Sequence, residues 1–146
     1  MCLSFPQKIK QKGDVTCYKV LLVEPNLRGF TNLRSPLFTE QGWEPYRTYT
    51  VTKAASPELL NGEIYGRAFH SFKTIEDCVK SECCPYPYRG RRRIYEAVIP
   101  ATSKFLYYGN VFYSFSGKPA QGYASQQLYI TREVSEDEIK KALENE

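Results

Sequence analysis

The stretch Gly62–Lys80, GEIYGRAFHSFKTIEDCVK, joins a strand pattern to a helix start and contains the only histidine of the chain. Its first part favours a β-strand, because it is rich in Ile, Tyr and Phe, which pack well on a pleated surface. Thr74, followed by two acidic residues, is typical of a helix N-terminus, because its hydroxyl can accept a hydrogen bond from a free N–H of the first turn. The stretch therefore predicts a strand that ends near Phe72 and a helix that begins after Thr74.

His70 lies late in this predicted strand. Because strand side chains alternate, it shares one face with Ala68 and Phe72. Phe69 and Ser71 then belong to the opposite face. One interpretation of His70 is a general base or ligand held on a rigid element, and the other is a half-buried histidine that hydrogen-bonds the backbone.

The rest of the chain adds more strands and a second helix. Strand patterns occur in residues 15–24, 43–53, 94–100, 105–108, 111–115 and within 123–134. Gly109-Asn110 between two apolar runs predicts a hairpin turn, and Ser135 with Glu138 has the spacing of a capping box at the start of a helix. We expect an α+β fold, formed by a single mostly antiparallel sheet of five to seven strands with about two helices, in one domain over residues 1–146.

Composition sets limits on the class of protein. The chain has 146 residues, 42% of them apolar, a net charge of +4 and five cysteines. This length fits one domain with a real core, and the mild charge does not by itself imply nucleic acid. The sequence has no apolar run long enough to span a bilayer and no signal-peptide pattern, so we expect a cytoplasmic protein with reduced thiols. Residues 1–14 are basic, with Lys8, Lys10 and Lys12 alternating, and are expected to form a loose arm or an edge segment.

The cysteines predict no metal site. Cys78, Cys83 and Cys84 lie near His70 in sequence, but adjacent Cys83 and Cys84 cannot easily point at one metal. Zinc sites use paired knuckles such as CxxC, and a second knuckle is missing here. We therefore expect neither a metal nor a cofactor, and small half-buried thiols are the alternative to any reactive cysteine.

The densest charge feature of the chain is a loop after the predicted helix. Its candidate ligand-binding residues are Tyr86, Tyr88, Arg89, Arg91, Arg92 and Arg93. Arginines bind phosphate with two hydrogen bonds, and tyrosines stack on bases or sugars. The loop suits a nucleotide, a nucleic-acid strand or an acidic protein partner, or it is a solvated loop whose arginines pair with nearby acids.

Three further polar residues are candidates. Tyr123 and Ser125 belong to a polar edge that could hydrogen-bond a small ligand. Glu96 stands among apolar residues on a predicted strand, where a carboxylate is either a general base or a satisfied edge charge. Together with His70, Glu96 completes the set of candidate catalytic residues.

Several short motifs resemble a small family of uncharacterised proteins encoded by phages and prophages. They are CYKVL (17–21), SPLF (35–38), Trp43 with Tyr49, AFHSFKTIEDC (68–78), EAVIP (96–100) and YASQQL (123–128). The resemblance covers most of the chain. It implies a compact accessory protein that acts inside a bacterial host cell, and it implies no activity.

The layout of polar residues on separated strands is also faintly similar to ADP-ribosyltransferases. In that fold an Arg or His, a Ser-Thr-Ser or Tyr element and a Glu surround NAD. His70, Tyr123 or Ser125, and Glu96 would fill those roles. The chain departs from the family pattern, since it has no Ser-Thr-Ser, and Gln126-Gln127 follows Ser125 in place of a Gln/Glu-x-Glu motif.

These observations favour a binding module over an enzyme. We expect it to engage a host protein or an anionic, nucleotide-like ligand through the Tyr/Arg-rich loop. The alternatives are a nucleotide-using enzyme similar to ADP-ribosyltransferases, with His70 and Glu96 in the site, and a nucleic-acid-binding protein that uses the same loop.

Overall fold

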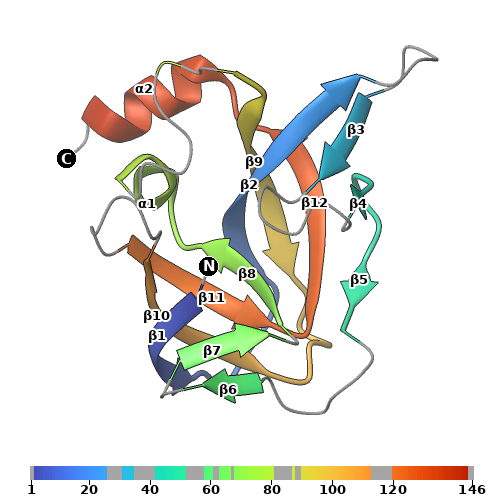
Figure 1. Cartoon of the computed structure of the whole chain (residues 1–146), viewed down its shortest axis with the longest axis vertical. Coiled ribbons are helices and arrows are strands. Elements are labelled where there is room, and N and C mark those ends of the chain that lie inside the picture. The colour runs from blue at the N-terminus through green and yellow to red at the C-terminus, as the bar shows by residue number, and fades with distance from the viewer. Residues whose placement is uncertain are drawn as a thin grey trace.

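The computed structural model describes residues 2–25, 31–34, 42–51, 58–60, 63–66, 68–80, 87, 90–112 and 120–144. Within these ranges there are twelve strands and two helices (Figure 1). In chain order they are β1 (Cys2–Lys8), β2 (Val15–Pro25), β3 (Thr31–Arg34), β4 (Gly42–Trp43), β5 (Tyr49–Thr50), β6 (Glu58–Leu60), β7 (Glu63–Gly66), β8 (Phe69–Phe72), α1 (Ile75–Lys80), β9 (Arg92–Ile99), β10 (Leu106–Phe112), β11 (Ala120–Ser125), β12 (Gln127–Glu133) and α2 (Glu136–Glu144).

The strands form one hydrogen-bonded sheet with the order β5-β12-β9-β2-β8-β11-β10-β1-β7-β6, and β3 and β4 branch from β2. Each pair of neighbouring strands is antiparallel. The expected α+β class, the mostly antiparallel sheet and the two helices are confirmed. The expected number of five to seven strands is wrong, because strands such as β3 and β6, of four and three residues, are too short to show strand periodicity. Each is formed by pairing with the strand beside it in the chain.

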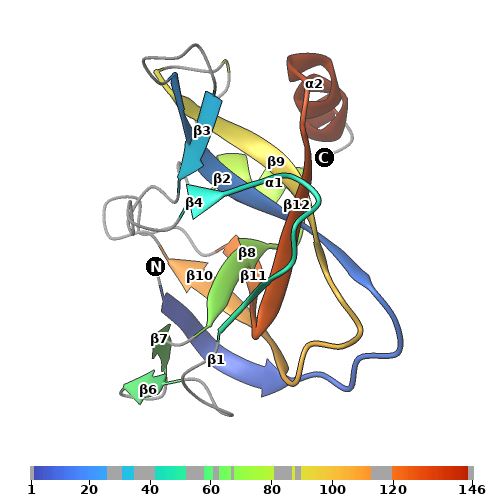
Figure 2. The ribbon, with the colours of Figure 1, turned by 90° about the vertical axis from the view of Figure 1, so that its right-hand side faces the viewer.

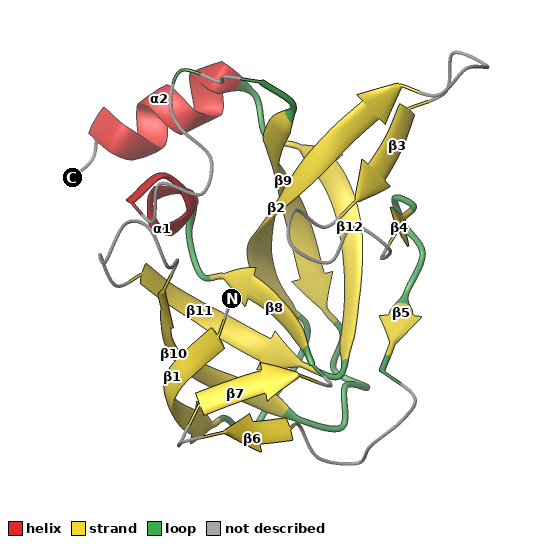
Figure 3. Ribbon diagram, in the orientation of Figure 1, coloured by secondary structure: helices red, strands yellow, loops and turns green. Residues whose placement is uncertain are grey.

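The sheet has two packed faces. Figure 3 shows α1 and α2 on one side of the long strands β2 and β9, and β3 and β4 on the other. We call the first the helix face: Val20, Phe72 and Ala124 pack there with Cys78 of α1 and Ile139 of α2. We call the second the Trp43 face. Its buried residues are Cys17, Leu21, Tyr95, Ala97, Ile99, Leu106, Tyr123, Leu128 and Ile130, together with Leu33 and Trp43 from β3 and β4.

Both helix starts follow the expected capping chemistry. The Thr74 hydroxyl accepts a hydrogen bond from the Asp77 N–H at 3.1 Å. At α2, the Ser135 hydroxyl accepts a bond from the Glu138 N–H at 3.2 Å, and the Glu138 carboxylate accepts one from the Ser135 N–H at 3.3 Å. This reciprocal pair is a capping box, so both predicted N-termini are confirmed.

The N-terminal segment differs from the loose arm or edge segment that was expected. Residues 2–8 form β1, which lies between β10 and β7 and pairs with both. Leu3 is fully buried in the core of the helix face. The buried Leu3 and two neighbouring strands hold a segment whose basic composition predicts no strand.

The hairpin predicted at Gly109-Asn110 is wrong. Both residues lie in the middle of β10, where Gly109 pairs with Gly122 and Asn110 with Gln121. Because β10 has β1 on one side and β11 on the other, the chain continues straight through the dipeptide. Sheet pairing on both edges thus overrides the local turn preference.

Over the described ranges, no helix has the length and apolar character needed to cross a bilayer.

Candidate functional site

The two faces of the sheet separate the residues that sequence reasoning grouped together. His70 pairs with Ala124, which is part of the helix-face core, and Ser71 pairs with Tyr123, which is part of the Trp43-face core. Residues that pair directly across strands share a face. His70 therefore belongs to the helix face, and Tyr123 to the opposite one.

Glu96 is on the helix face as well, next to Tyr18, with which it pairs. Its carboxylate accepts a hydrogen bond from Arg132 at 3.1 Å. The same guanidinium makes two bonds to Glu138, at 2.6 and 2.8 Å. These bonds to Glu138 raise the pKa of Arg132 and lower the pKa of Glu138 to about 2. Glu96 thus serves as one side of an ion-pair network that joins β9, β12 and α2.

His70 is 6% exposed, and its main-chain carbonyl oxygen accepts a hydrogen bond of 2.6 Å from the Lys19 ammonium. Ser125 is fully buried and donates its hydroxyl to the Gln127 carbonyl at 2.9 Å. That bond lies where the chain passes from β11 to β12, so it gives Ser125 a role in shaping the turn. The structure therefore does not bring His70, Glu96, Tyr123 and Ser125 to one place.

The Trp43 face instead brings Tyr123, a candidate from the sequence, together with residues that sequence reasoning did not select. Tyr108, Tyr123 and Ser71 lie side by side across β10, β11 and β8, as their pairing requires. The rings of Tyr108 and Tyr123 are 5.6 Å apart and tilted. Burial raises the pKa of Tyr123, and the nearby Cys17 and Tyr108 add to the effect. Tyr123 is thus a neutral hydroxyl in a row of polar and aromatic groups.

A lysine lies over an aromatic ring at two points of this face. The Lys73 ammonium is 5.4 Å from the ring centre of Tyr108, and Lys73 itself is exposed. The Lys19 ammonium is 5.5 Å from the ring centre of Trp43 and only 8% of Lys19 is exposed. A cation within about 6 Å of a ring face is attracted by the ring quadrupole. The two ammonium groups flank the Tyr108–Tyr123–Ser71 row.

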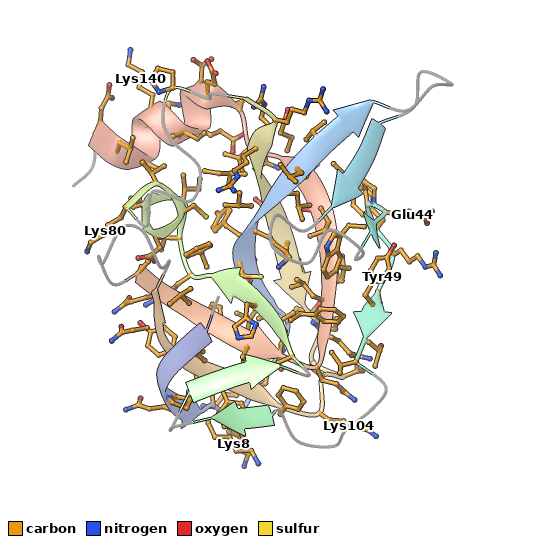
Figure 4. The ribbon with its side chains drawn as sticks, in the orientation of Figure 1. Lys8, Glu44, Tyr49, Lys80, Lys104 and Lys140 are labelled. Carbon is orange, nitrogen blue, oxygen red and sulfur yellow. The ribbon has the colours of Figure 1, made fainter. Side chains whose placement is uncertain are left out.

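Trp43 also has aromatic neighbours. Its ring makes edge contacts with Tyr49 at 4.8 Å and with Phe69 at 5.1 Å between ring centres. Figure 4 shows Tyr49 on β5 at the margin of the molecule, beside Glu44. The guanidinium of Arg47 lies 5.3 Å from the Tyr49 ring centre. The aromatic group thus reaches from the core to the surface.

Cys17 and Ser71 are fully buried neighbours of Lys19 and Tyr123 on the Trp43 face. Burial raises the pKa of the Cys17 thiol to about 12, although the neighbouring Ser71 hydroxyl lowers it in part. The Ser71 hydroxyl oxygen is buried, and the described residues give it no hydrogen-bond partner of regular geometry. A protonated thiol at this depth is not a nucleophile.

The structure describes only the end of the arginine-rich loop. Tyr86, Tyr88 and Arg89 lie outside the described residues, as do Cys83 and Cys84. Arg91 is exposed and Arg92 is half-buried. Arg93 pairs with Leu21, which places it on the Trp43 face. Its guanidinium donates a hydrogen bond to the Gly90 carbonyl at 2.8 Å and forms an ion pair with Glu133 at 3.8 Å.

No group of three or more His, Cys, Asp or Glu side chains that could hold a metal occurs in the part of the chain that the structure describes. Comparisons with protein-family models, with curated proteins and with solved structures find no match to this chain.

One sequence signal could have identified the Trp43 face. Lys19 is the only charged residue between Val15 and Val23, in a strand predicted to be central. A lysine in such a position requires a polar partner or a ring. The partners, His70 and Trp43, lie too far away in sequence for a local pattern to name them.

Proposed function

We propose that this protein is a binding module for an anionic ligand that contains a planar ring, such as a nucleotide-like compound, and that the Trp43 face binds it. The observation that carries the proposal is the pair of ammonium groups, Lys19 and Lys73, that lie over aromatic rings on either side of Tyr123. Rings give a flat ligand stacking surfaces, and lysines give its phosphate a counter-charge.

The exposed members of the face define where a ligand would first make contact. Lys73 is exposed and Tyr108 half-buried, so both are open to solvent. Arg93 lies on the same face beyond Tyr95, which pairs with Lys19. The ligand's phosphate would lie between Lys73 and the tyrosine row, with Arg93 on the same face as a second anion contact.

The placement of the candidate catalytic residues favours binding over transfer chemistry. His70 and Glu96 are on the helix face, and the carboxylate of Glu96 is bonded to Arg132. An enzyme similar to ADP-ribosyltransferases would need them beside Tyr123. A host protein as the partner, and a bacterial cell as the location, remain predictions from the sequence.

A thermal-shift screen tests the proposal, with NAD, ADP-ribose, mononucleotides and cyclic dinucleotides as ligands. A ligand that binds the native state raises the melting temperature in proportion to the logarithm of its concentration. Lys73→Gln and Tyr108→Leu should each lower the affinity for the ligand about tenfold. Lys140→Gln, a matched change on α2, should leave the affinity unchanged.

An arginine variant distinguishes the Trp43 face from the arginine-rich loop as the ligand site. The triple variant Arg91→Ala/Arg92→Ala/Arg93→Ala should weaken binding less than Lys73→Gln if the face is the main site. A shift that is lost only in the arginine variant would move the site to the loop. The absence of a shift with each ligand would reject a nucleotide-like ligand for this face.

A further inference from the structure

The connection between β1 and β2 is fixed against the end of β9 and the start of β10 by four hydrogen bonds. The Gln11 side chain donates to the carbonyls of Ile99 and Pro100, both at 2.9 Å. The Ile9 N–H donates to the Leu106 carbonyl at 2.8 Å, and the Asp14 carboxylate accepts from the Ala101 N–H at 2.9 Å. Figure 2 shows this connection as a wide arc at one end of the molecule.

This anchoring turns a set of lysines outward. Gln11 points toward the protein, and Lys8, Lys10 and Lys12 on alternate positions around it are all exposed. Lys104 is exposed as well, and Figure 4 shows Lys8 and Lys104 at the same end of the molecule. We call Lys8, Lys10, Lys12 and Lys104 the lysine end.

Within the described ranges, no carboxylate forms an ion pair with an ammonium group of the lysine end. The ion pairs of the described residues are Arg47–Glu44, Arg93–Glu133, Arg132–Glu96 and Arg132–Glu138. An array of like charges on a fixed backbone raises the local potential and favours a polyanion.

The spacing and the neighbouring rings indicate the kind of polyanion. Alternate residues of an extended chain are about 6.6 Å apart, and spacing of this order distributes the lysines along the connection that follows β1. Lys8 pairs directly with Tyr107 of β10, whose half-buried ring lies 5.9 Å from that of Phe105. A series of lysines beside an aromatic ring is the combination that tracks a phosphate backbone and stacks an unpaired base.

We propose that the lysine end binds the backbone of a single-stranded nucleic acid. An anionic membrane fits less well, because surface anchoring needs a substantial apolar face and Ile9 is only 36% exposed. This site is separate from the Trp43 face and does not depend on the ligand proposed there. If each of the four lysines neutralises one phosphate, the logarithm of the binding constant should fall with log[salt] with a slope of about −3.

The experiment measures fluorescence anisotropy of a labelled thymidine oligomer of about 12 nucleotides, with the full chain, between about 50 and 200 mM salt. Lys8→Gln/Lys10→Gln/Lys12→Gln should weaken binding at least tenfold at low salt and make the slope shallower by about 2. The matched control is Lys80→Gln/Lys140→Gln/Lys141→Gln, which removes the same charge near the helices. It should keep most of the affinity.

Three outcomes would overturn the proposal. The first is no binding at the lowest salt, and the second is an equal loss in both triple variants, which would reduce the effect to net charge. The third is binding to phosphatidylserine vesicles but not to the oligomer, which would assign the lysine end to a lipid surface. Melting curves of each variant establish that a loss of binding is not a loss of folding. A further variant, Lys104→Gln, tests the lysine end with a single change at an exposed residue.

Discussion

The ammonium of Lys19 donates a hydrogen bond of 2.6 Å to the main-chain carbonyl oxygen of His70. The two residues lie on β2 and β8, neighbouring strands that pair at Tyr18 and Phe72. The Lys19 side chain therefore links β2 to the main chain of β8. The buried ammonium contributes to holding these two strands together.

Lys19→Met should therefore destabilise the protein. Methionine keeps the apolar stem and removes the donor, which leaves the buried carbonyl of His70 without this bond. Removing one partner of a buried hydrogen bond costs about 1–3 kcal/mol, so the free energy of unfolding should fall by that amount. Urea denaturation measures it. Lys140→Met, on the exposed side of α2, is the control and should change stability by less than about 0.5 kcal/mol. Equal effects of the two changes would disprove the role of Lys19.

Gly122→Ala should be strongly destabilising for a steric reason. A Cβ at Gly122 would lie 2.4 Å from the Ser71 carbonyl oxygen and 2.4 Å from a methyl group of Val111. Both contacts are far inside van der Waals distance, and the first is with backbone that cannot move away easily. Overpacking of this kind costs about 1–3 kcal/mol or more, which chemical denaturation would detect.

Gly13→Ala is the matched control for that change. A Cβ at Gly13 would have no atom within 4 Å, and its backbone lies outside the positive-φ region. Replacing glycine by alanine at such a position restricts the unfolded chain, so stability should stay the same or rise by up to about 1 kcal/mol. If Gly122→Ala were as well tolerated as Gly13→Ala, β8 and β10 would not approach Gly122 of β11 as closely as the structure shows.

Local chemistry made part of this fold predictable. The side-chain alternation of residues 68–72 and the caps at Thr74 and Ser135 depend on neighbours within a few residues, and the structure has them as expected. The path of β10 through Gly109-Asn110 depends on β1, a partner far away in the chain. Strands β3 and β6 are too short to show a strand period, so single-sequence patterns miss them as well.

The candidate site was predictable to a smaller extent. Alternation around His70 and the strand containing Tyr123 were visible, but their relative faces follow from the register of β8 on β11, which local patterns do not fix. The same is true of Lys19 and Trp43, whose contact requires β3 and β4 to lie over β2. Long-range pairing decides which side chains meet.

The ion pair of Arg132 and Glu138 predicts a pH dependence. The folded-state pKa of Glu138 is lowered from 4.5 to about 2, chiefly by its hydrogen bond to Arg132. A lowered carboxyl pKa gives stability that is present above pH 4.5 and lost as the pH falls through about 2. Glu138→Gln preserves the capping box and removes the charge. The variant should be less stable than the wild type at pH 6 and equally stable near pH 2.

The control for this effect is Glu136→Gln in the same first turn of α2. Arg132 bonds Glu96 and Glu138, so the loss of the Glu136 charge should not reproduce the pH-dependent difference. Urea unfolding of the three proteins at several pH values measures it. A wild-type advantage over Glu138→Gln that persists unchanged at pH 2 would mean that the ion pair is not its source.

The thiol of Cys17 should be chemically silent in the native protein. It is fully buried, and burial raises its pKa to about 12, so the reactive thiolate is scarce at pH 8. Iodoacetamide should leave Cys17 unmodified under native conditions and modify it fully in denaturant, as peptide mass spectrometry of residues 13–19 would show. Cys78, which is also fully buried, should behave in the same way. Native labelling of Cys17 but not of Cys78 would show that the Trp43 face opens to solvent while the helix face stays closed. Protection of both thiols would mean that a ligand must bind the Trp43 face from its exposed margin, at Lys73 and Tyr108.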